Sequence, residues 1–132
     1  MSGETDISLL LKNMTPKLNE GGYVFCTVTS VSDINPEDII GTFKEEEGWT
    51  VILNKDLADQ LNHKYSYIAS WITLTIHSSL EAVGLTAAFA QALANAGISC
   101  NVVAAYYHDH IFVAKQDAEK AMKVLKELSS NN

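Results

Sequence analysis

The segment from Tyr106 to Val113 contains an aspartate with one histidine on each side, within an otherwise aromatic and apolar run. On an extended strand, residues two apart share a face, so His108 and His110 would point together. Two imidazoles and a carboxylate form a facial metal site in some enzymes. We favour a tight hairpin turn, in which aspartate tolerates a left-handed backbone and bonds nearby amides. A metal-dependent enzyme using His108, Asp109 and His110 stays as an alternative.

A second segment, from His77 to Phe89, joins an expected strand to an expected amphipathic helix. Ser78 and Glu81 are three residues apart, the spacing of a capping box. We expect Gly84 to allow close approach of the backbone to a neighbour. Unpaired amides at a helix start carry partial positive charge, which suits a ligand carboxylate. Glu81 would then hold a ligand amine, unless the segment is an ordinary capped helix start.

Other catalytic patterns are absent from the sequence. The pair Gly21–Gly22 precedes a strand, so it matches neither a phosphate-binding loop nor a dinucleotide fingerprint. No serine lies in a nucleophile-elbow context. Cys26 and Cys100 each lie in an apolar, strand-like run, which favours free buried thiols in a reducing compartment over a catalytic thiol. We therefore expect no catalytic residue, no metal and no cofactor.

Several regular elements must position these segments. Residues 66–77 alternate as a strand, with Ile72, Leu74 and Ile76 inward. An amphipathic helix follows over 85–96 and ends at Gly97. The runs SCNVVAAYY and HIFVA predict two strands joined by a very short turn. A final helix begins after Gln116 or Asp117.

The first half predicts a fainter version of the same order. Helical spacing runs from Ile7 to Leu18 behind a cap at Thr5, and Tyr23–Val31 forms a strand. A short helix starts at Asn35 and Pro36 and ends at Gly41. A turn at EEEG, a strand over 49–53 and a helix over 54–61 follow. We expect a tandem repeat with a degenerate domain over 1–63 and a second domain over 64–132.

The amino-acid composition and net charge limit the classes of function that the protein can have. Of the 132 residues, 47% are apolar and 19% charged, a globular balance. The net charge of −7 and the scattered lysines argue against a nucleic-acid partner. No apolar run approaches the roughly 20 residues that cross a bilayer, and the acidic N-terminus is unlike a signal peptide. We expect a soluble cytoplasmic protein with no membrane partner.

The run from Trp71 to Leu125 resembles an ACT domain, the small regulatory module of amino-acid metabolism. The matching features are the S-L-x-A-V-G-L loop, the A-x-A-G-I-S helix exit and the Y-H-D-H-I-F-V hairpin. The resemblance covers about residues 64 to 128. Within the family, this region is most similar to bacterial ACT proteins related to the arginine sensors of the animal growth pathway. The first half resembles the companion domain that usually precedes it.

This resemblance implies an α+β fold with ferredoxin-like ACT sheets, helices on one face and tandem domains. The second half has no clear fourth strand, so its sheet must borrow one, from the first half. The resemblance also implies a free-standing, non-enzymatic homo-oligomer that binds an amino acid or similar small ligand at a domain interface. The alternative is a protein-interaction module with a vestigial pocket. The implied ligand residues are Ser78, Ser79, Leu80, Glu81, Val83, Gly84, Tyr106 and Asp109.

Overall fold

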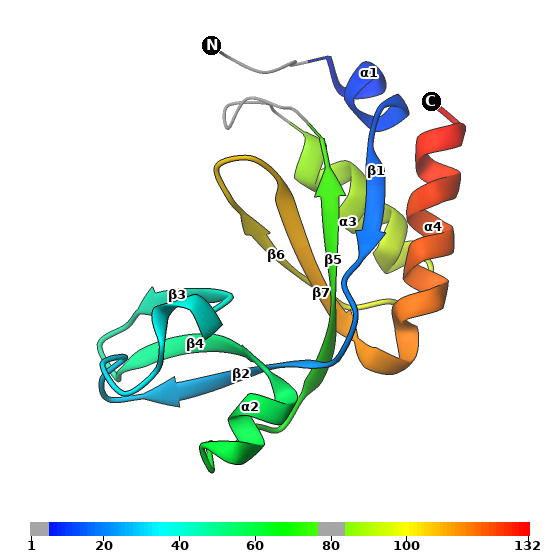
Figure 1. Ribbon diagram of the computed structural model, residues 1–132. Coiled ribbons are helices and arrows are strands. Elements are labelled where there is room, and N and C mark those ends of the chain that lie inside the picture. Colours follow the sequence, from blue (N-terminus) through cyan, green and yellow to red (C-terminus); the bar gives the residue numbers. More distant parts are fainter. Residues whose placement is uncertain (1–5, 77–83) are drawn as a thin grey trace. The chain divides into compact units, whose positions relative to one another are not determined.

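The computed structural model describes residues 6–76 and 84–132 (Figure 1). The chain divides into two compact units. One consists of the residues up to Glu20 together with Ser70–Asn132, and we call it the host unit. The other, Gly21–Ala69, lies within the host unit in the sequence, and we call it the inserted unit. The predicted domain boundary after residue 63 stays a prediction.

The host unit contains a four-stranded arrangement in the order β1-β5-β7-β6. Strand β5 begins with two residues of the inserted unit and then continues through the host unit. Contacts from Trp71 to Phe112 and from Thr73 to His110 run in opposite directions along β5 and β7. The elements are α1 (Ile7–Lys12), β1 (Thr15–Leu18), β5 (Ile68–Thr75), α3 (Leu85–Asn95), β6 (Cys100–Ala104), β7 (Asp109–Ala114), η2 (Lys115–Asp117) and α4 (Ala118–Ser130).

Strand β1 supplies the fourth strand that the second half lacks. It pairs antiparallel with β5, Thr15 opposite Thr75 and Leu18 opposite Ile72. The predicted helix over this region is therefore wrong beyond Lys12, where α1 ends. Pro16 cannot donate the helical hydrogen bond, whereas its ring is tolerated in an edge strand. The predicted cap Thr5 lies outside the described residues, and Asp6 accepts a hydrogen bond from the Leu9 amide.

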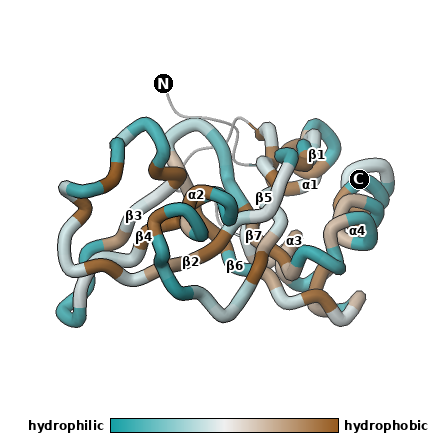
Figure 2. Tube along the Cα trace, turned by 60° about the horizontal axis from the view of Figure 1, so that its bottom comes forward, coloured by the Kyte–Doolittle hydropathy of each residue, from teal (hydrophilic) through white to brown (hydrophobic). Residues whose placement is uncertain are grey.

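Helices cover one face of the host sheet. The inward positions Ile72, Leu74 and Ile76 are buried as predicted, together with Ile111 and Val113 of β7. Helix α4 is amphipathic, and Figure 2 shows hydrophobic and hydrophilic stretches alternating along it. The helical residues in this core are Leu10, Leu11, Leu85, Phe89, Leu93, Ala121 and Leu125. Gly97 follows α3 with φ +77°, as its predicted place after the helix requires.

The inserted unit repeats the order in shorter form. Asn35 caps its first helical element by accepting from the Glu37 amide, as the sequence predicts, and Asn54, expected inside the second helix, caps it by accepting from the Asp56 amide. Its strands follow the order β3-β4-β2, and the first residues of β5 pair with β2. The elements are β2 (Tyr23–Val28), η1 (Pro36–Asp38), β3 (Gly41–Lys44), β4 (Trp49–Asn54) and α2 (Lys55–Gln60).

Strand β3 is absent from the sequence prediction. Gly41 was expected to end a helix, whereas it opens β3 and pairs with Ile52 of β4. Four residues, largely exposed and including Phe43, carry too little alternation to indicate a strand. The turn at EEEG is confirmed by reciprocal backbone bonds between Glu45 and Gly48.

Both units therefore have the order strand, helical element, strand, strand, helix. This confirms the α+β class and the ferredoxin-like tandem repeat. The core of the inserted unit is small and consists of Val24, Cys26, Ile34, Val51, Leu53 and Ala58.

Candidate functional site

The predicted ligand residues are only partly covered by the described structure. Ser78, Ser79, Leu80, Glu81 and Val83 lie outside the described residues, as does the predicted capping box. Their role in binding stays a prediction. Gly84, Tyr106 and Asp109 are described, and all three belong to the host unit.

Gly84 is the N-cap residue of α3 and has φ +89°. A Cβ built on it would lie 3.9 Å from Ile7 Cγ1, an ordinary contact. The expected close approach of the backbone stays a prediction, and the left-handed conformation by itself favours glycine here. Within the described part of the chain, no side chain caps this helix start.

The hairpin tip consists of Tyr106 and Tyr107, two residues earlier than expected. The Ala105 amide donates to the His108 carbonyl, which closes the turn around the two tyrosines. Their exposed fractions are 82% and 74%, and their rings meet edge to face at 5.0 Å. Tyr106 therefore lies in the solvent in this structure, and the turn contains neither Asp109 nor His110.

Asp109 is the first residue of β7 and pairs with Ala104 of β6. Its side chain shares the helix-covered face with Ile111 and Val113, because strand residues two apart point the same way. It is 8% exposed, which is unusual for an aspartate. Burial raises the pKa of its carboxyl, and the nearby His110 and His108 oppose that shift. The expected position in a turn is wrong, because the alternation of β7 extends to Asp109.

Strand pairing brings Asp109 to the end of the sheet at which β5 finishes. Thr73 of β5 contacts His110, so the residues preceding His110 lie beside those that follow Thr73. Strand β5 ends at Thr75, and the next described helix starts behind Gly84. Asp109 thus starts its strand where β5 passes into the segment before α3.

A polar cluster on the opposite face of the host sheet was not predicted. The Trp71 indole N–H donates to His110 Nδ1 at 3.0 Å, and Thr73 Oγ1 lies 3.2 Å from the same nitrogen. Asn19 Nδ2 donates to Thr73 Oγ1 at 3.0 Å and to the Trp71 carbonyl at 3.2 Å. The alternation of polar and apolar residues along a strand indicates which face of the sheet a side chain lies on, but not which strand pairs with it. The sequence therefore carries no signal for this cluster.

The three residues of the HDH run are divided between two faces. Asp109 faces the helices, and His110 bonds across the other face to Trp71. His108 Nδ1 is buried without a hydrogen-bond partner among the described residues. The rings of His108 and His110 are 6.5 Å apart, centre to centre. Across residues 6–76 and 84–132, no group of three histidine, cysteine or acidic side chains has metal-site geometry.

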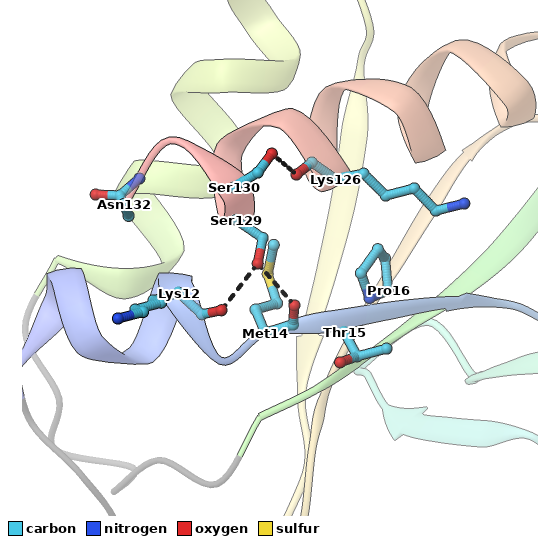
Figure 3. A pocket seen from close by; sticks show the side chains of 8 residues that line it. All are labelled: Lys12, Met14, Thr15, Pro16, Lys126, Ser129, Ser130 and Asn132. Atoms are coloured by element: carbon cyan, nitrogen blue, oxygen red, sulfur yellow. Dashed lines mark hydrogen bonds between the residues drawn. The ribbon is translucent and has the colours of Figure 1, made fainter.

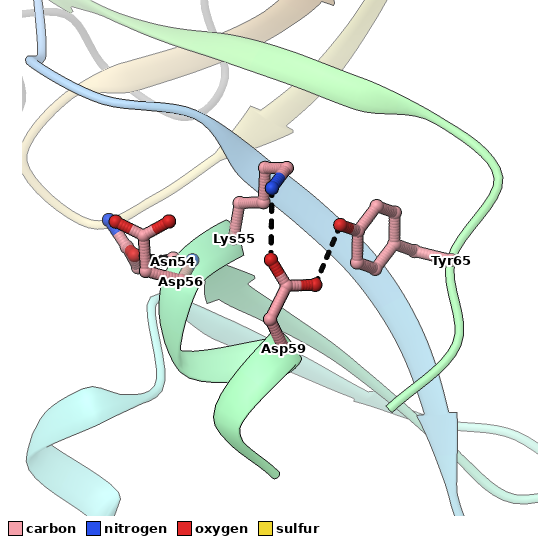
Figure 4. Close-up of polar contacts among 5 residues, drawn as sticks. All are labelled: Asn54, Lys55, Asp56, Asp59 and Tyr65. Atoms are coloured by element: carbon pink, nitrogen blue, oxygen red, sulfur yellow. Dashed lines mark hydrogen bonds and ion pairs between the residues drawn. The ribbon is translucent and has the colours of Figure 1, made fainter. Parts of the chain in front are cut away.

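A polar cluster in the inserted unit joins α2 to the segment after it (Figure 4). Asp59 accepts from Lys55 Nζ at 2.9 Å and from the Tyr65 hydroxyl at 2.7 Å. The hydrogen bond from Lys55 lowers the pKa of Asp59. The hydrogen bonds that Lys55 and Tyr65 donate to Asp59 raise the pKa of each donor. All three groups are solvent-accessible, so this cluster supports the local turn and contributes little to stability.

Ser129 connects the end of α4 to the junction between α1 and β1 (Figure 3). Its hydroxyl oxygen lies 3.1 Å from the Lys12 carbonyl oxygen and 3.0 Å from the Met14 carbonyl oxygen. A pocket of about 400 Å³ lies beside these bonds, and Lys126 is one of the residues that line it. The serine therefore holds the segment that leads into the borrowed strand.

The two cysteines are free thiols, as predicted. Cys26 is buried, whereas Cys100 is partly exposed at the start of β6. Burial raises the pKa of both thiols, which lowers the thiolate fraction at neutral pH. A nucleophilic role for either cysteine has no support from this environment.

No helix among the described residues is long and apolar enough to cross a membrane.

Comparison with protein families gives two matches, each described as an ACT domain. One model matches residues 2–70 and another matches residues 66–127. Together they span nearly all of the chain. No curated protein matches the sequence.

Solved structures agree in fold. A protein of unknown function from Vibrio cholerae, described as a possible transport protein, is 52% identical, with 92% of this chain and 94% of that chain covered and a TM-score of 0.84. An Agrobacterium tumefaciens protein is 18% identical, with 88% and 89% covered and a TM-score of 0.63. The regulatory subunit of aspartate kinase from Thermus thermophilus is 10% identical, with 87% and 95% covered and a TM-score of 0.55.

Proposed function

Because this chain belongs to the ACT-domain family, with two ACT domains in tandem, we propose that it is a non-enzymatic regulatory protein that binds an amino acid or a related small ligand. ACT domains have ligand-binding regulatory roles, and neither matching model describes a catalytic domain. We further propose that it acts in the cytoplasm as a homo-oligomer. Ligand binding would favour one arrangement of the protein, which a partner then recognises.

The observation that carries the proposal is the buried carboxylate of Asp109. Removing a charged group from water costs free energy, and the raised pKa of Asp109 reflects that cost. A ligand ammonium beside this carboxylate would provide an opposite charge in a place of low water content. The free-energy cost of burying the Asp109 carboxylate would then be offset only when a cationic group of the ligand is bound.

The ligand carboxylate requires a different kind of partner. The sequence contains no arginine, so a bidentate guanidinium clamp from this chain is excluded. We propose that amides of the segment Ser78–Gly84, with Ser78, Ser79, Leu80, Glu81 and Val83, hold this end of the ligand. Helix α3 behind Gly84 has eleven residues and adds the partial positive charge of its N-terminus.

Thermal shift against the common amino acids tests the proposal. A binding amino acid at millimolar concentration should raise the unfolding midpoint by about 2 °C or more. The Asp109→Asn variant should lose this response, and Asp33→Asn, which changes an exposed aspartate of the inserted unit, should keep it. If no amino acid shifts the wild-type midpoint, the amino-acid-binding proposal is wrong.

A protein-interaction module is the second candidate, and the exposed tyrosines of the hairpin tip favour it. Adjacent exposed aromatic side chains are common at protein interfaces. In that case Tyr106→Ala with Tyr107→Ala would abolish capture of a partner, whereas Asp109→Asn would leave it unchanged. Pull-down with the variants from the native host separates the two functions.

A further inference from the structure

The bonds around His110 determine where its proton lies. An indole N–H is only a donor, and it points at His110 Nδ1 over 3.0 Å. Nδ1 must therefore carry a lone pair, and the ring is neutral with its proton on Nε2. Because Asn19 Nδ2 donates to Thr73 Oγ1, the threonine's own hydroxyl hydrogen is available for Nδ1.

This cluster connects three strands of the host unit. His110 lies on β7, and Trp71 and Thr73 lie on β5. Asn19 directly follows β1, and its backbone amide also donates to the Trp71 carbonyl at 2.9 Å. The side chain and the backbone of Asn19 thus both fasten the end of β1 to the residues that bond His110.

We propose that His110 is a proton-sensitive latch that holds the borrowed strand β1 on the host sheet. A proton on Nδ1 removes the lone pair that accepts from Trp71 and Thr73 and sets an N–H against the indole N–H. Thr73 then turns its hydroxyl hydrogen away from the ring, and the bond from Asn19 is lost or weakened. Acidification therefore loosens β1 from β5.

The construction of β1 makes it responsive to so small a change. It has four residues, and its ladder continues into Asn19 opposite Trp71. Pro16 has no amide hydrogen, and exposed Lys17 gains nothing from burial. Short strands of this kind belong to the least stable parts of a fold, where local opening occurs first. Weakening of the bond from Asn19 Nδ2 to Thr73 Oγ1 therefore acts directly at one end of a four-residue strand.

Among the described residues of the host unit, few charged groups lie near His110. Lys17 of β1 lies opposite Thr73 on the same face, and His108 and Asp109 lie on the same chain segment. Trp71 and Thr73 of β5 and Val103 of β6, its partner in the ladder, are uncharged. Burial lowers the pKa of His110, the charge of His108 lowers it further, and Asp109 raises it. Protonation of His110 therefore needs a lower pH than that of an ordinary histidine.

Hydrogen exchange at the amide of Asn19 tests the latch directly. In wild-type protein, its protection factor should fall by about five- to tenfold between pH 7.5 and pH 5, after correction for the intrinsic pH dependence of exchange. His110→Asn supplies an amide oxygen near the position of Nδ1 without a titrating group. It should keep protection at both pH values. His108→Asn keeps the bonds of His110 and should retain a pH-dependent loss of protection, moved to higher pH because His108 no longer lowers the pKa of His110.

Nitrogen NMR of the wild-type imidazole provides a readout that needs no variant. The Nδ1 resonance should have the shift of an unprotonated ring nitrogen at pH 7.5, and it should move to that of a protonated nitrogen together with the loss of protection. Protection that is independent of pH, or an equal loss in His110→Asn, would overturn the proposal. A protonated Nδ1 at pH 7.5 would overturn it as well.

Discussion

Asp109 and His110 are consecutive residues of β7 whose side chains lie on opposite faces of the host sheet. Asp109 is buried on the face that the helices cover, and His110 accepts a hydrogen bond from Trp71 on the other. Successive side chains of a strand point to opposite faces, so these two ionisable neighbours lie in different environments. Asp109 is the proposed contact of a ligand ammonium, and His110 is the proposed latch of strand β1.

Replacing Asp109 by asparagine should stabilise the ligand-free protein at neutral pH. Burial raises the folded-state pKa of this carboxyl, so the protonated form is the one that suits the fold. The stability from protonated Asp109 is complete below its unfolded pKa of about 3.9 and is lost as the pH rises through the folded pKa. Urea unfolding at pH 7 and pH 3 should show a gain in Asp109→Asn at pH 7 that vanishes at pH 3. A less stable variant at pH 7 would show that the carboxylate is already well paired.

Replacing Gly84 by alanine should destabilise the host unit by about 1–2 kcal/mol, because an L-residue is strained at positive φ. Gly84 has φ +89°, and the nearest described atom lies 3.9 Å from a Cβ built on it, so we expect the effect to come from backbone strain. Gly41→Ala is the matched control, since its Cβ would meet Ile52 Cδ1 at 3.4 Å without positive φ. Chemical denaturation of both variants should show a clearly larger loss for Gly84→Ala.

Replacing Ser129 by alanine should cost about 1–2 kcal/mol, because the carbonyls of Lys12 and Met14 lose their side-chain donor. Ser130→Ala is the control, since the Ser130 hydroxyl bonds only within its own helix, to Lys126 and Glu127. Hydrogen exchange should show the loss of protection in β1 for Ser129→Ala alone. Equal effects of the two variants would contradict a specific role for Ser129.

Replacing Leu125 by alanine should cost about 2–5 kcal/mol, because the side chain is fully buried in the host core. Lys126→Ala, on the exposed side of the same helix, should change stability by less than about 0.5 kcal/mol. Thermal unfolding by circular dichroism measures both variants. Similar midpoints would mean that α4 is not packed as described.

Local sequence signals predicted much of each unit. The alternation of Ile72, Leu74 and Ile76 and the spacing of the residues in α3 and α4 indicated the faces that are buried. Asn35 and Gly97 indicated element ends through capping and left-handed backbone chemistry. These signals succeed because both the cause and its effect lie within a few residues.

The turn in YYHDHIFV was placed two residues too late. Aspartate is common in turns, yet the strand pattern of Ile111 and Val113 continues back to Asp109, and the tyrosines take the tip. A preference of one residue type for turns is weaker than the pairing of a whole strand. The buried state of Asp109 follows from that pairing and not from its neighbours in sequence.

The sequence by itself determined the two-fold order of elements, the inward faces and the family features of the second half. Only the tertiary structure decided that Thr15–Leu18 form the fourth strand on β5, that Ser129 holds their approach, and that His110 bonds Trp71 and Thr73. The apolar spacing up to Leu18 favours a helix, whereas pairing with β5 makes Thr15–Leu18 a strand. The outcome depends on partners far along the chain, which local pattern does not contain.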